Sequence, residues 1–290
     1  MNAKQSLWGR LALLSAALIW GSSFFVMKNA VAGIPVFLLL AIRFTAGFGL
    51  LAVIFWKKLV RLTKLGILRG AVCGVLLFTA YAVQTFGIKY TTAGKNAFLT
   101  AVYCVLVPFL GWIFFRSRPT KSNWLAGAMC LGGIGLVSLE GDLSVNIGDV
   151  LTLIGGLFYA LHIIAVTRFG RQEDAVALTQ VQFGAAALCC WMMTLCTETF
   201  PSVWPQNAWL ELTYLAVFAT TAALLLQNVG QAVTPAAPAA ILLSLESVFG
   251  VLFSVMFGGE SVTVKLLCGF ALIFAAVVVS EVGSAQKAKK

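Results

Sequence analysis

Ten long runs of apolar residues, separated by short polar segments, account for most of the 290-residue chain. They cover residues 11–27, 36–56, 70–88, 97–115, 124–139, 150–167, 175–195, 212–229, 239–257 and 266–282. A helix rises about 1.5 Å per residue, so about 20 apolar residues cross the hydrocarbon core of a bilayer. Each run is of helix length, and the alternation typical of a membrane β-barrel is absent. The pattern predicts an all-α membrane protein with ten transmembrane helices.

One proline falls inside a predicted span. Six of the seven prolines lie between spans or at the start of one, where a missing N–H costs little. Pro108 lies within residues 97–115, where its ring and the lost backbone hydrogen bond favour a bent helix. We therefore expect a kink in the fourth span.

The two halves of the chain resemble each other. QTFGIKYTTAGKNA (84–97) aligns without gaps with QNVGQAVTPAAPAA (227–240), and RFTAG (43–47) aligns with QFGAA (182–186). Each half holds five spans, an odd number, so the second half must enter the membrane from the opposite side. We predict two inverted five-helix repeats, residues 1–142 and 143–290. Such repeats are typical of alternating-access carriers, whose substrate site lies at the repeat interface.

Deep polar and aromatic residues fall at corresponding places in the repeats. The alignment pairs Trp20 with Tyr159, Ser23 with His162, Arg43 with Gln182, Gln84 with Gln227, and Tyr103 with Glu246. Two such sets facing one axis would form a pocket with apolar walls and a few convergent polar groups. The candidate substrate-binding residues are Trp20, Arg43, Tyr81, Gln84, Tyr103, Tyr159, His162, Gln227 and Glu246. Their aromatic rings suit a ligand with an apolar body or an ammonium group.

Glu246 is the carboxylate that lies well inside a long apolar run, eight positions into residues 239–257. A charge at the bilayer centre costs roughly 2.5 to 3.5 kcal/mol on insertion scales, so such residues usually face a cavity. Glu246 is therefore a candidate substrate or proton site. The alternative is a protonated side chain that only hydrogen-bonds a neighbouring helix.

Structural interpretations stay open for other candidates as well. Gln84, Gln182 and Gln227 could link neighbouring helices by hydrogen bonds. Arg43 could extend to the membrane surface or pair with a backbone carbonyl. His162, the single histidine of the chain, could pack or titrate.

Composition excludes a soluble globular domain. The chain is 60% hydrophobic and 10% charged, with a mean hydropathy of +0.96, whereas soluble domains are about 25% charged. Of the 20 Lys and Arg residues, fifteen fall in loops on one side, four fall on the other, and Arg43 lies in a span. This bias explains the net charge of +10 without a nucleic-acid partner, and it predicts cytoplasmic termini in a multi-pass cell membrane protein.

Catalytic, metal-binding and cofactor-binding patterns are missing from the sequence. The seven cysteines lie within or at the edge of apolar spans, without a CxxC or Cys/His spacing. An intramembrane enzyme would need paired carboxylates, several histidines, or a nucleophile with its base. We expect neither an enzyme nor a bound metal or cofactor. Because no ATP-binding motif is present, transport would be driven by a gradient, with protons as one candidate coupling ion.

Several stretches resemble the EamA-type permeases of the drug/metabolite transporter superfamily, over essentially the whole chain. They are IWGSSFFVMK (19–28), AIRFTAG (41–47), NAFLTAVYCVLVPFLGWIFFRSRPT (96–120) and SLESVFGVLFSVMFGGES (244–261). The family has a Glu-Pro pair in the ninth span, and this chain has Glu246-Ser247 there. Glu260 matches the glutamate of the family's Gly-Glu pair at the outer end of that span, and we interpret Glu260 as structural. The resemblance implies ten helices in two inverted repeats. It also implies a cavity lined by spans one, three, four, six, eight and nine, and export of amino acids or other small metabolites.

We therefore predict a secondary transporter that exports a small metabolite, such as an amino acid, across the cytoplasmic (inner) membrane by alternating access. An antiporter of phosphorylated metabolites or nucleotide sugars is the alternative, but it would need clustered deep Lys or Arg beyond Arg43 and Lys95. A channel or a membrane receptor is also compatible with this sequence. The sequence does not indicate the substrate, the coupling ion or the oligomeric state.

Overall fold

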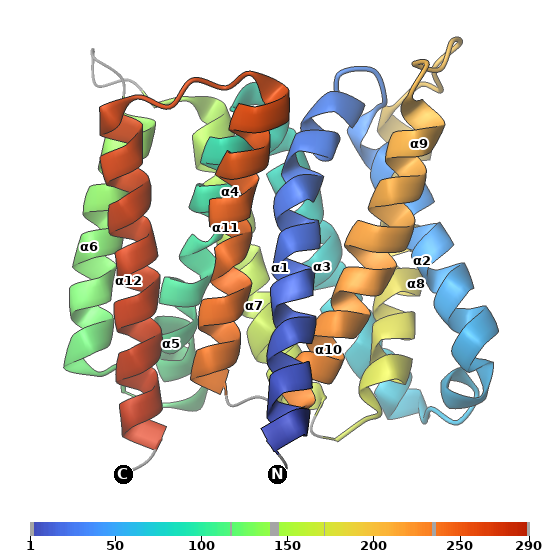
Figure 1. The fold of residues 1–290 in the computed structure, drawn as a ribbon. Coiled ribbons are helices and arrows are strands. Elements are labelled where there is room, and N and C mark those ends of the chain that lie inside the picture. Colours follow the sequence, from blue (N-terminus) through green and yellow to red (C-terminus); the bar gives the residue numbers. More distant parts are fainter. Residues whose placement is uncertain (1–2, 117, 140–144, 171, 234–235, 289–290) are drawn as a thin grey trace.

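A computed structural model describes residues 3–116, 118–139, 145–170, 172–233 and 236–288 (Figure 1). The first half comprises α1 (Ala3–Ala30), α2 (Val36–Leu59), α3 (Lys64–Tyr90), α4 (Ala93–Thr100), α5 (Val102–Phe115) and α6 (Lys121–Ser138). The second half comprises α7 (Ile147–Phe169), α8 (Ala175–Thr197), α9 (Ala208–Thr213), η1 (Tyr214–Ala222), α10 (Ala223–Val233), α11 (Ala236–Gly258) and α12 (Val264–Ala288). These helices form the ten predicted spans, five in each half, and the all-α membrane fold is confirmed.

Length and composition agree with a membrane location. Among the described residues, seven helical segments are long and apolar enough to cross a bilayer. Leu242–Gly258 and Val264–Ser280 are shorter apolar helices in the same part of the chain.

The fourth span is divided at Ala101, between α4 and α5. The Cys104 N–H bonds the Ala101 carbonyl three residues back, at 3.1 Å, so the chain makes one tighter turn there. Helix α5 continues through Pro108. The expected irregularity therefore occurs in this span but seven residues before the proline. A proline removes a single backbone donor, which a packed membrane helix can tolerate.

The eighth span contains nine residues of π-helix, η1, between α9 and α10. Two threonine hydroxyls donate to carbonyls five residues back: Thr220 to Leu215 at 2.8 Å and Thr221 to Ala216 at 2.9 Å. Segments of this kind are rare and occur frequently at functional sites. The apolar pattern did not predict it.

Helices of the two halves interlock. The most extensive packing joins α3 to α7, α6 to α12, α1 to α11 and α2 to α8, and each pair takes one span from each half. The α3–α7 pair is especially close, because a Cβ on Gly148 would lie 2.7 Å from the carbonyl oxygen of Gly87. Helices α6 and α12 lie side by side at one edge of the molecule (Figure 1). The remaining helices enclose the interior between the halves.

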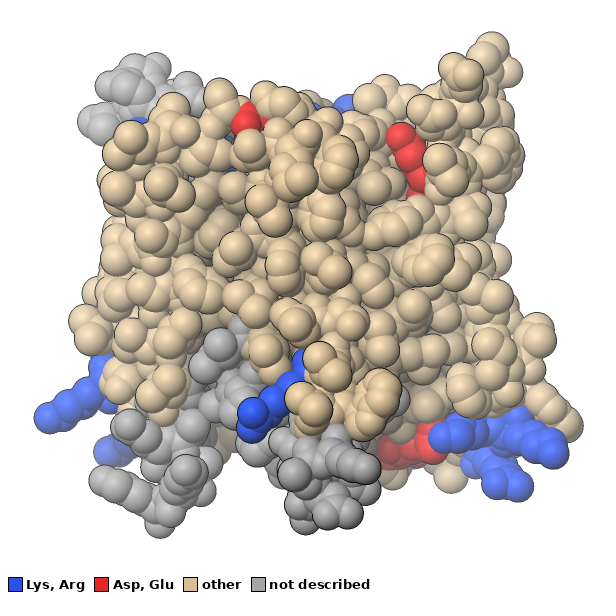
Figure 2. Space-filling model, in the orientation of Figure 1, with Lys and Arg blue, Asp and Glu red and all other residues tan. Residues whose placement is uncertain are grey.

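The two ends of the helical bundle differ in charge. Helix α1 begins and α12 ends on the same side of the molecule, which we call the termini side (Figure 1). Basic side chains gather at that side in the view of Figure 2. Ion pairs there join Lys58 to Asp174 at 2.8 Å and Arg69 to Glu173 at 2.6 Å, which ties α2 and α3 to the segment between α7 and α8.

Candidate functional site

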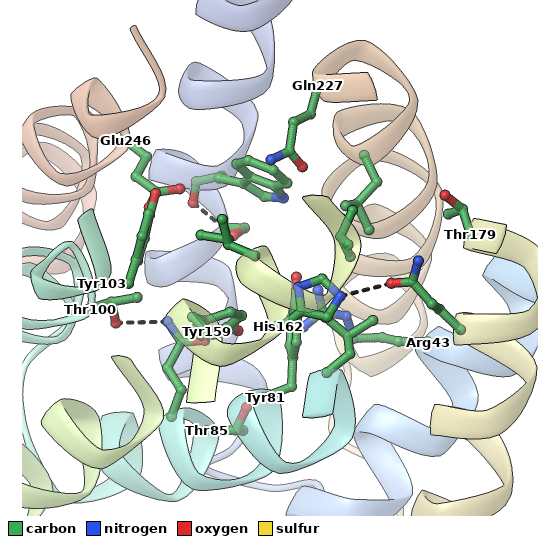
Figure 3. A pocket seen from close by; sticks show the side chains of 18 of the residues that line it. Arg43, Tyr81, Thr85, Thr100, Tyr103, Tyr159, His162, Thr179, Gln227 and Glu246 are labelled. Carbon is green, nitrogen blue, oxygen red and sulfur yellow. Dashed lines mark hydrogen bonds between the residues drawn. The ribbon is translucent and has the colours of Figure 1, made fainter. Parts of the chain in front are cut away.

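A cavity of about 190 Å³ lies between the two halves, and all nine residues predicted from the sequence line it (Figure 3). They come from seven helices, and each half contributes to the wall. Spans one, three, four, six, eight and nine take part, as the resemblance implied. The structure adds span two through Arg43 and span seven through Thr179 and Gln182.

Glu246 and Tyr103 meet directly at one side of the cavity. The Tyr103 hydroxyl donates to Glu246 Oε1 at 3.0 Å, and the Glu246 side chain is nearly buried, with 6% exposed. Within the described residues, no Lys, Arg or His lies within ion-pair distance of this carboxyl group. The carboxyl group thus faces the cavity with a neutral partner, where it is available to a proton or a cationic ligand.

Both the oxygen and the nitrogen of the Gln84 side-chain amide form hydrogen bonds. Tyr159 donates its hydroxyl to Gln84 Oε1 at 2.8 Å, and Gln84 Nε2 donates to Thr100 Oγ1 at 2.8 Å. This chain joins α7, α3 and the last residue of α4 beside the break in the fourth span. Gln84 therefore links helices, as its structural interpretation expected, and it also faces the cavity.

Thr100 and Asn96 are cavity residues that the sequence reasoning missed. Asn96, Thr100 and Tyr103 are spaced by four and three residues, so they share one side of a helical run. This spacing of polar residues in an apolar segment could have identified Asn96 and Thr100 as cavity residues from the sequence.

Arg43 does not extend to the membrane surface, since only 2% of it is exposed. Its Nε donates to Thr220 Oγ1 of η1 at 3.1 Å, and its Cζ lies 5.2 Å from the centre of the Tyr81 ring. Its third contact is the sulfur of Met27, 3.9 Å from a terminal nitrogen. These partners are all neutral.

His162 pairs with Gln182, with 2.7 Å between Nε2 and Oε1, and only 9% of the histidine is exposed. The repeat alignment did not bring these two together, because it matched Gln182 to Arg43. In the part of the chain that the structure describes, no group of three or more His, Cys, Asp and Glu residues could hold a metal ion.

Aromatic rings form a continuous wall. Tyr81 and Tyr159 meet edge to face with ring centres 5.4 Å apart, and Tyr103 lies 6.3 Å from Tyr159. The indole N–H of Trp20 donates to the Ala219 carbonyl in η1 at 2.8 Å, so the face of the ring is left for packing. Gln227 of α10 completes the group (Figure 3).

The cavity reaches the surface on the termini side. Its lining extends to Gly170 at the end of α7 and to Ala175 at the start of α8, and Ala175 is exposed. At the other end, the lining residues Ile88 and Asn96 are 1% and 0% exposed. The cavity is therefore open at one end and closed at the other.

Glu260 holds the closed end together around the start of α4. Its carboxylate accepts the Gly94 N–H at 3.0 Å and also the hydroxyls of Thr92 and Ser254. A carboxylate at a helix N-terminus is favoured by the exposed N–H groups and the helix dipole. This position fits the structural interpretation of Glu260.

Two lysines complete that closed end. Lys28 Nζ donates to the carbonyls of Ile88 at 2.8 Å and Thr91 at 2.6 Å, at the C-terminus of α3. Lys95 lies 3.6 Å from Asp149, a fully buried carboxylate that also accepts the Thr91 hydroxyl at 2.5 Å. Sequence reasoning assigned no role to Asp149, because it lies at the edge of a span where acidic residues are common.

Known proteins match the chain over nearly its full length. The model of the EamA-like transporter family matches residues 7–139 and 146–281. An uncharacterized transporter of Archaeoglobus fulgidus is 32% identical, over 94% of this chain and 86% of the relative. The uncharacterized inner membrane transporter YedA of Escherichia coli K12 is 26% identical, over 93% of this chain and 89% of the relative.

A solved crystal structure of another protein superposes on this fold with a TM-score of 0.70, covering 100% of both chains at 18% identity, which shows a likeness of fold alone. The family model matches each half of the chain separately, in agreement with the internal repeat. This chain is a multi-pass membrane protein that belongs to the EamA-like transporter family.

Proposed function

We propose that the protein is a secondary transporter that exports a small metabolite, such as an amino acid, by alternating access. The observation that carries this proposal is a cavity at the repeat interface that opens on one side only. A carrier must present its site to one side of the membrane at a time, and inverted repeats supply the symmetry for the opposite state. A channel would require a continuous path.

The distribution of basic residues supports a direction of transport. Because the loops on the termini side carry most of the Lys and Arg, this side faces the cytoplasm of a cell whose inner membrane holds the protein. The open end of the cavity then loads substrate from the cytoplasm, as an exporter requires. The lining supports an amino-acid-like substrate, because aromatic rings accommodate an apolar body and Glu246 can receive an ammonium group or a coupling proton.

A phosphorylated metabolite or nucleotide sugar fits less well. Phosphate sites are built from several Lys or Arg side chains. Among the described residues that line the cavity, Arg43 is the single Lys or Arg. The charge of the cavity therefore favours a substrate that is neutral overall.

Counterflow in proteoliposomes tests the proposal. Vesicles are preloaded with one unlabelled amino acid at a time, and uptake of the same labelled amino acid at low external concentration is followed. A carrier gives a transient accumulation that saturates with concentration, whereas a channel gives equilibration and a receptor gives none. The absence of counterflow for every amino acid tested, with phosphorylated metabolites active, would overturn the amino-acid assignment in favour of the alternative.

A further inference from the structure

We propose that Arg43 is the anion subsite of the cavity, which binds the carboxylate of the substrate and points its ammonium group toward Glu246. This inference rests on the proposed function and deepens it. It assigns one end of the substrate to α2 and η1 and the other end to α11.

The first observation is a buried cation without an acidic partner. Arg43 is 2% exposed, and within the described residues no carboxylate lies within 4.0 Å of its guanidinium. Thr220, Tyr81 and Met27 surround it instead. A buried charge is costly unless it is paired, so this environment favours the entry of an anion. The side chain lines the cavity, from which such an anion can arrive.

The second observation concerns which nitrogen is already used. Thr220 donates its own proton to the Leu215 carbonyl at 2.8 Å, so its oxygen is free to accept from Arg43 Nε at 3.1 Å. This contact anchors the guanidinium through Nε, the Tyr81 side chain is a second hydrogen-bond partner, and the guanidinium has five N–H donors in all, so donors are left for a ligand. One terminal nitrogen lies 3.9 Å from the Met27 sulfur, which is a weak acceptor that a carboxylate oxygen can replace. Two parallel N–H groups match the two oxygens of a carboxylate.

The third observation is the separation of the two charged groups. Arg43 comes from α2 and Glu246 from α11, on opposite sides of the cavity, and the Tyr159 and Tyr81 rings lie between them (Figure 3). The two charges form no ion pair with each other. A zwitterion spanning the cavity would satisfy both ends without a protein ion pair. The rings would then contact the apolar part of the substrate.

A structural role for Arg43 makes a different prediction. If the side chain only joins α2 to η1 through Thr220, its loss affects all ligands equally. A carboxylate subsite affects only ligands that carry the acid. Three compounds of the same size separate these cases: phenylalanine, phenethylamine, which lacks the carboxylate, and 3-phenylpropionate, which lacks the ammonium group.

The experiment measures binding of the three compounds by calorimetry to purified wild-type protein, Arg43→Gln, Arg43→Lys and Glu246→Gln. Arg69→Gln, which removes an arginine outside the cavity, is the matched control. We expect Arg43→Gln to weaken phenylalanine and 3-phenylpropionate by about tenfold or more and phenethylamine by less than about twofold. Arg43→Lys should fall between the wild type and Arg43→Gln, and Glu246→Gln should weaken only the two amines. Equal weakening of all three compounds by Arg43→Gln, or no weakening, overturns the subsite.

Two further measurements cover the cases in which Arg43→Gln does not fold or the wild type binds none of the compounds. If Arg43→Gln does not fold, Arg43→Lys and Thr220→Val are compared with the wild type, and a loss that is the same with and without the carboxylate overturns the proposal. If the wild type binds none of the three compounds, phenylalanine is not a substrate, and the amino-acid function is decided by the counterflow experiment. The subsite is then tested by the melting temperature in sodium benzoate and in sodium chloride. Stabilisation by benzoate that Arg43→Gln abolishes supports the subsite, and the same response in both proteins overturns it.

Discussion

The Tyr103 hydroxyl lies 3.0 Å from Glu246 Oε1, and these two residues occupy equivalent positions of the two repeats. They are 143 residues apart in the chain, yet the inverted symmetry brings them face to face across the repeat interface. A residue and its repeat counterpart can meet in this way only near the symmetry axis. The contact therefore lies near the symmetry axis that relates the two repeats, at one side of the cavity.

Replacing Glu246 by Gln should remove the pH dependence of transport while the protein stays folded. Gln keeps the volume and can still accept from Tyr103, but it cannot gain or lose a proton during the proposed alternating-access cycle. Uptake in proteoliposomes is measured across roughly pH 5 to 8, next to the melting temperature of the same preparations. Tyr103→Phe, which keeps the acid, is the control and should retain the pH dependence. A Gln variant that transports like the wild type at every pH contradicts a functional role, and lower stability with ordinary pH dependence supports a purely structural one.

Trp20→Ala should weaken substrate binding more than Trp204→Ala. Trp20 lines the cavity and bonds Ala219 in η1, whereas Trp204 stacks on Trp209, with ring centres 5.0 Å apart, outside the cavity. Losing a ring that contacts a ligand costs about 1 kcal/mol or more, so we expect at least a fivefold change in Kd for Trp20→Ala. The thermal shift induced by amino acids measures it. Equal losses in two folded variants would remove Trp20 from the binding site.

Glu260→Gln should lower the melting temperature in detergent. Gln leaves one acceptor oxygen where the carboxylate now accepts from Thr92, Gly94 and Ser254, and it removes the negative charge at the start of α4. Hydrogen bonds to a charged group contribute about 1.5 to 3 kcal/mol, and we expect a loss in that range because the group is partly buried. Glu211→Gln in α9, outside this network, should change stability little. An unchanged melting temperature for Glu260→Gln would show that the network does not hold the closed end.

Cysteine labelling tests the orientation. In a Cys-free background, single cysteines at Asn146 and Pro205 should react with an impermeant reagent added outside intact cells. Cysteines at Lys64 and Ser122 should react only after the membrane is opened. The basic bias of the loops requires this result. The reverse labelling pattern would place the termini outside and would change the proposed direction of transport.

The span map and the repeat could be predicted from the sequence, because both depend on local features. A run of about 20 apolar residues indicates a membrane helix wherever it occurs, and two aligned segments indicate a repeat without any knowledge of packing. The same alignment selected Tyr103 and Glu246, and all nine selected residues line one cavity. Polar residues are costly in a membrane, so those that remain tend to face the interior.

Tertiary structure alone decided which of those residues meet and which end of the cavity is closed. Arg43 and Thr220 are 177 residues apart, and no local pattern relates them. The break at Ala101 and the π-helix of η1 arise where side chains of other spans, such as Gln84 and Trp20, bond groups beside the irregular backbone. The closed end likewise depends on Glu260 reaching the start of α4 from a distant loop. Apolar runs determine that a segment crosses the membrane, whereas its irregular backbone lies where distant segments hydrogen-bond to it, and only the folded chain brings those groups together.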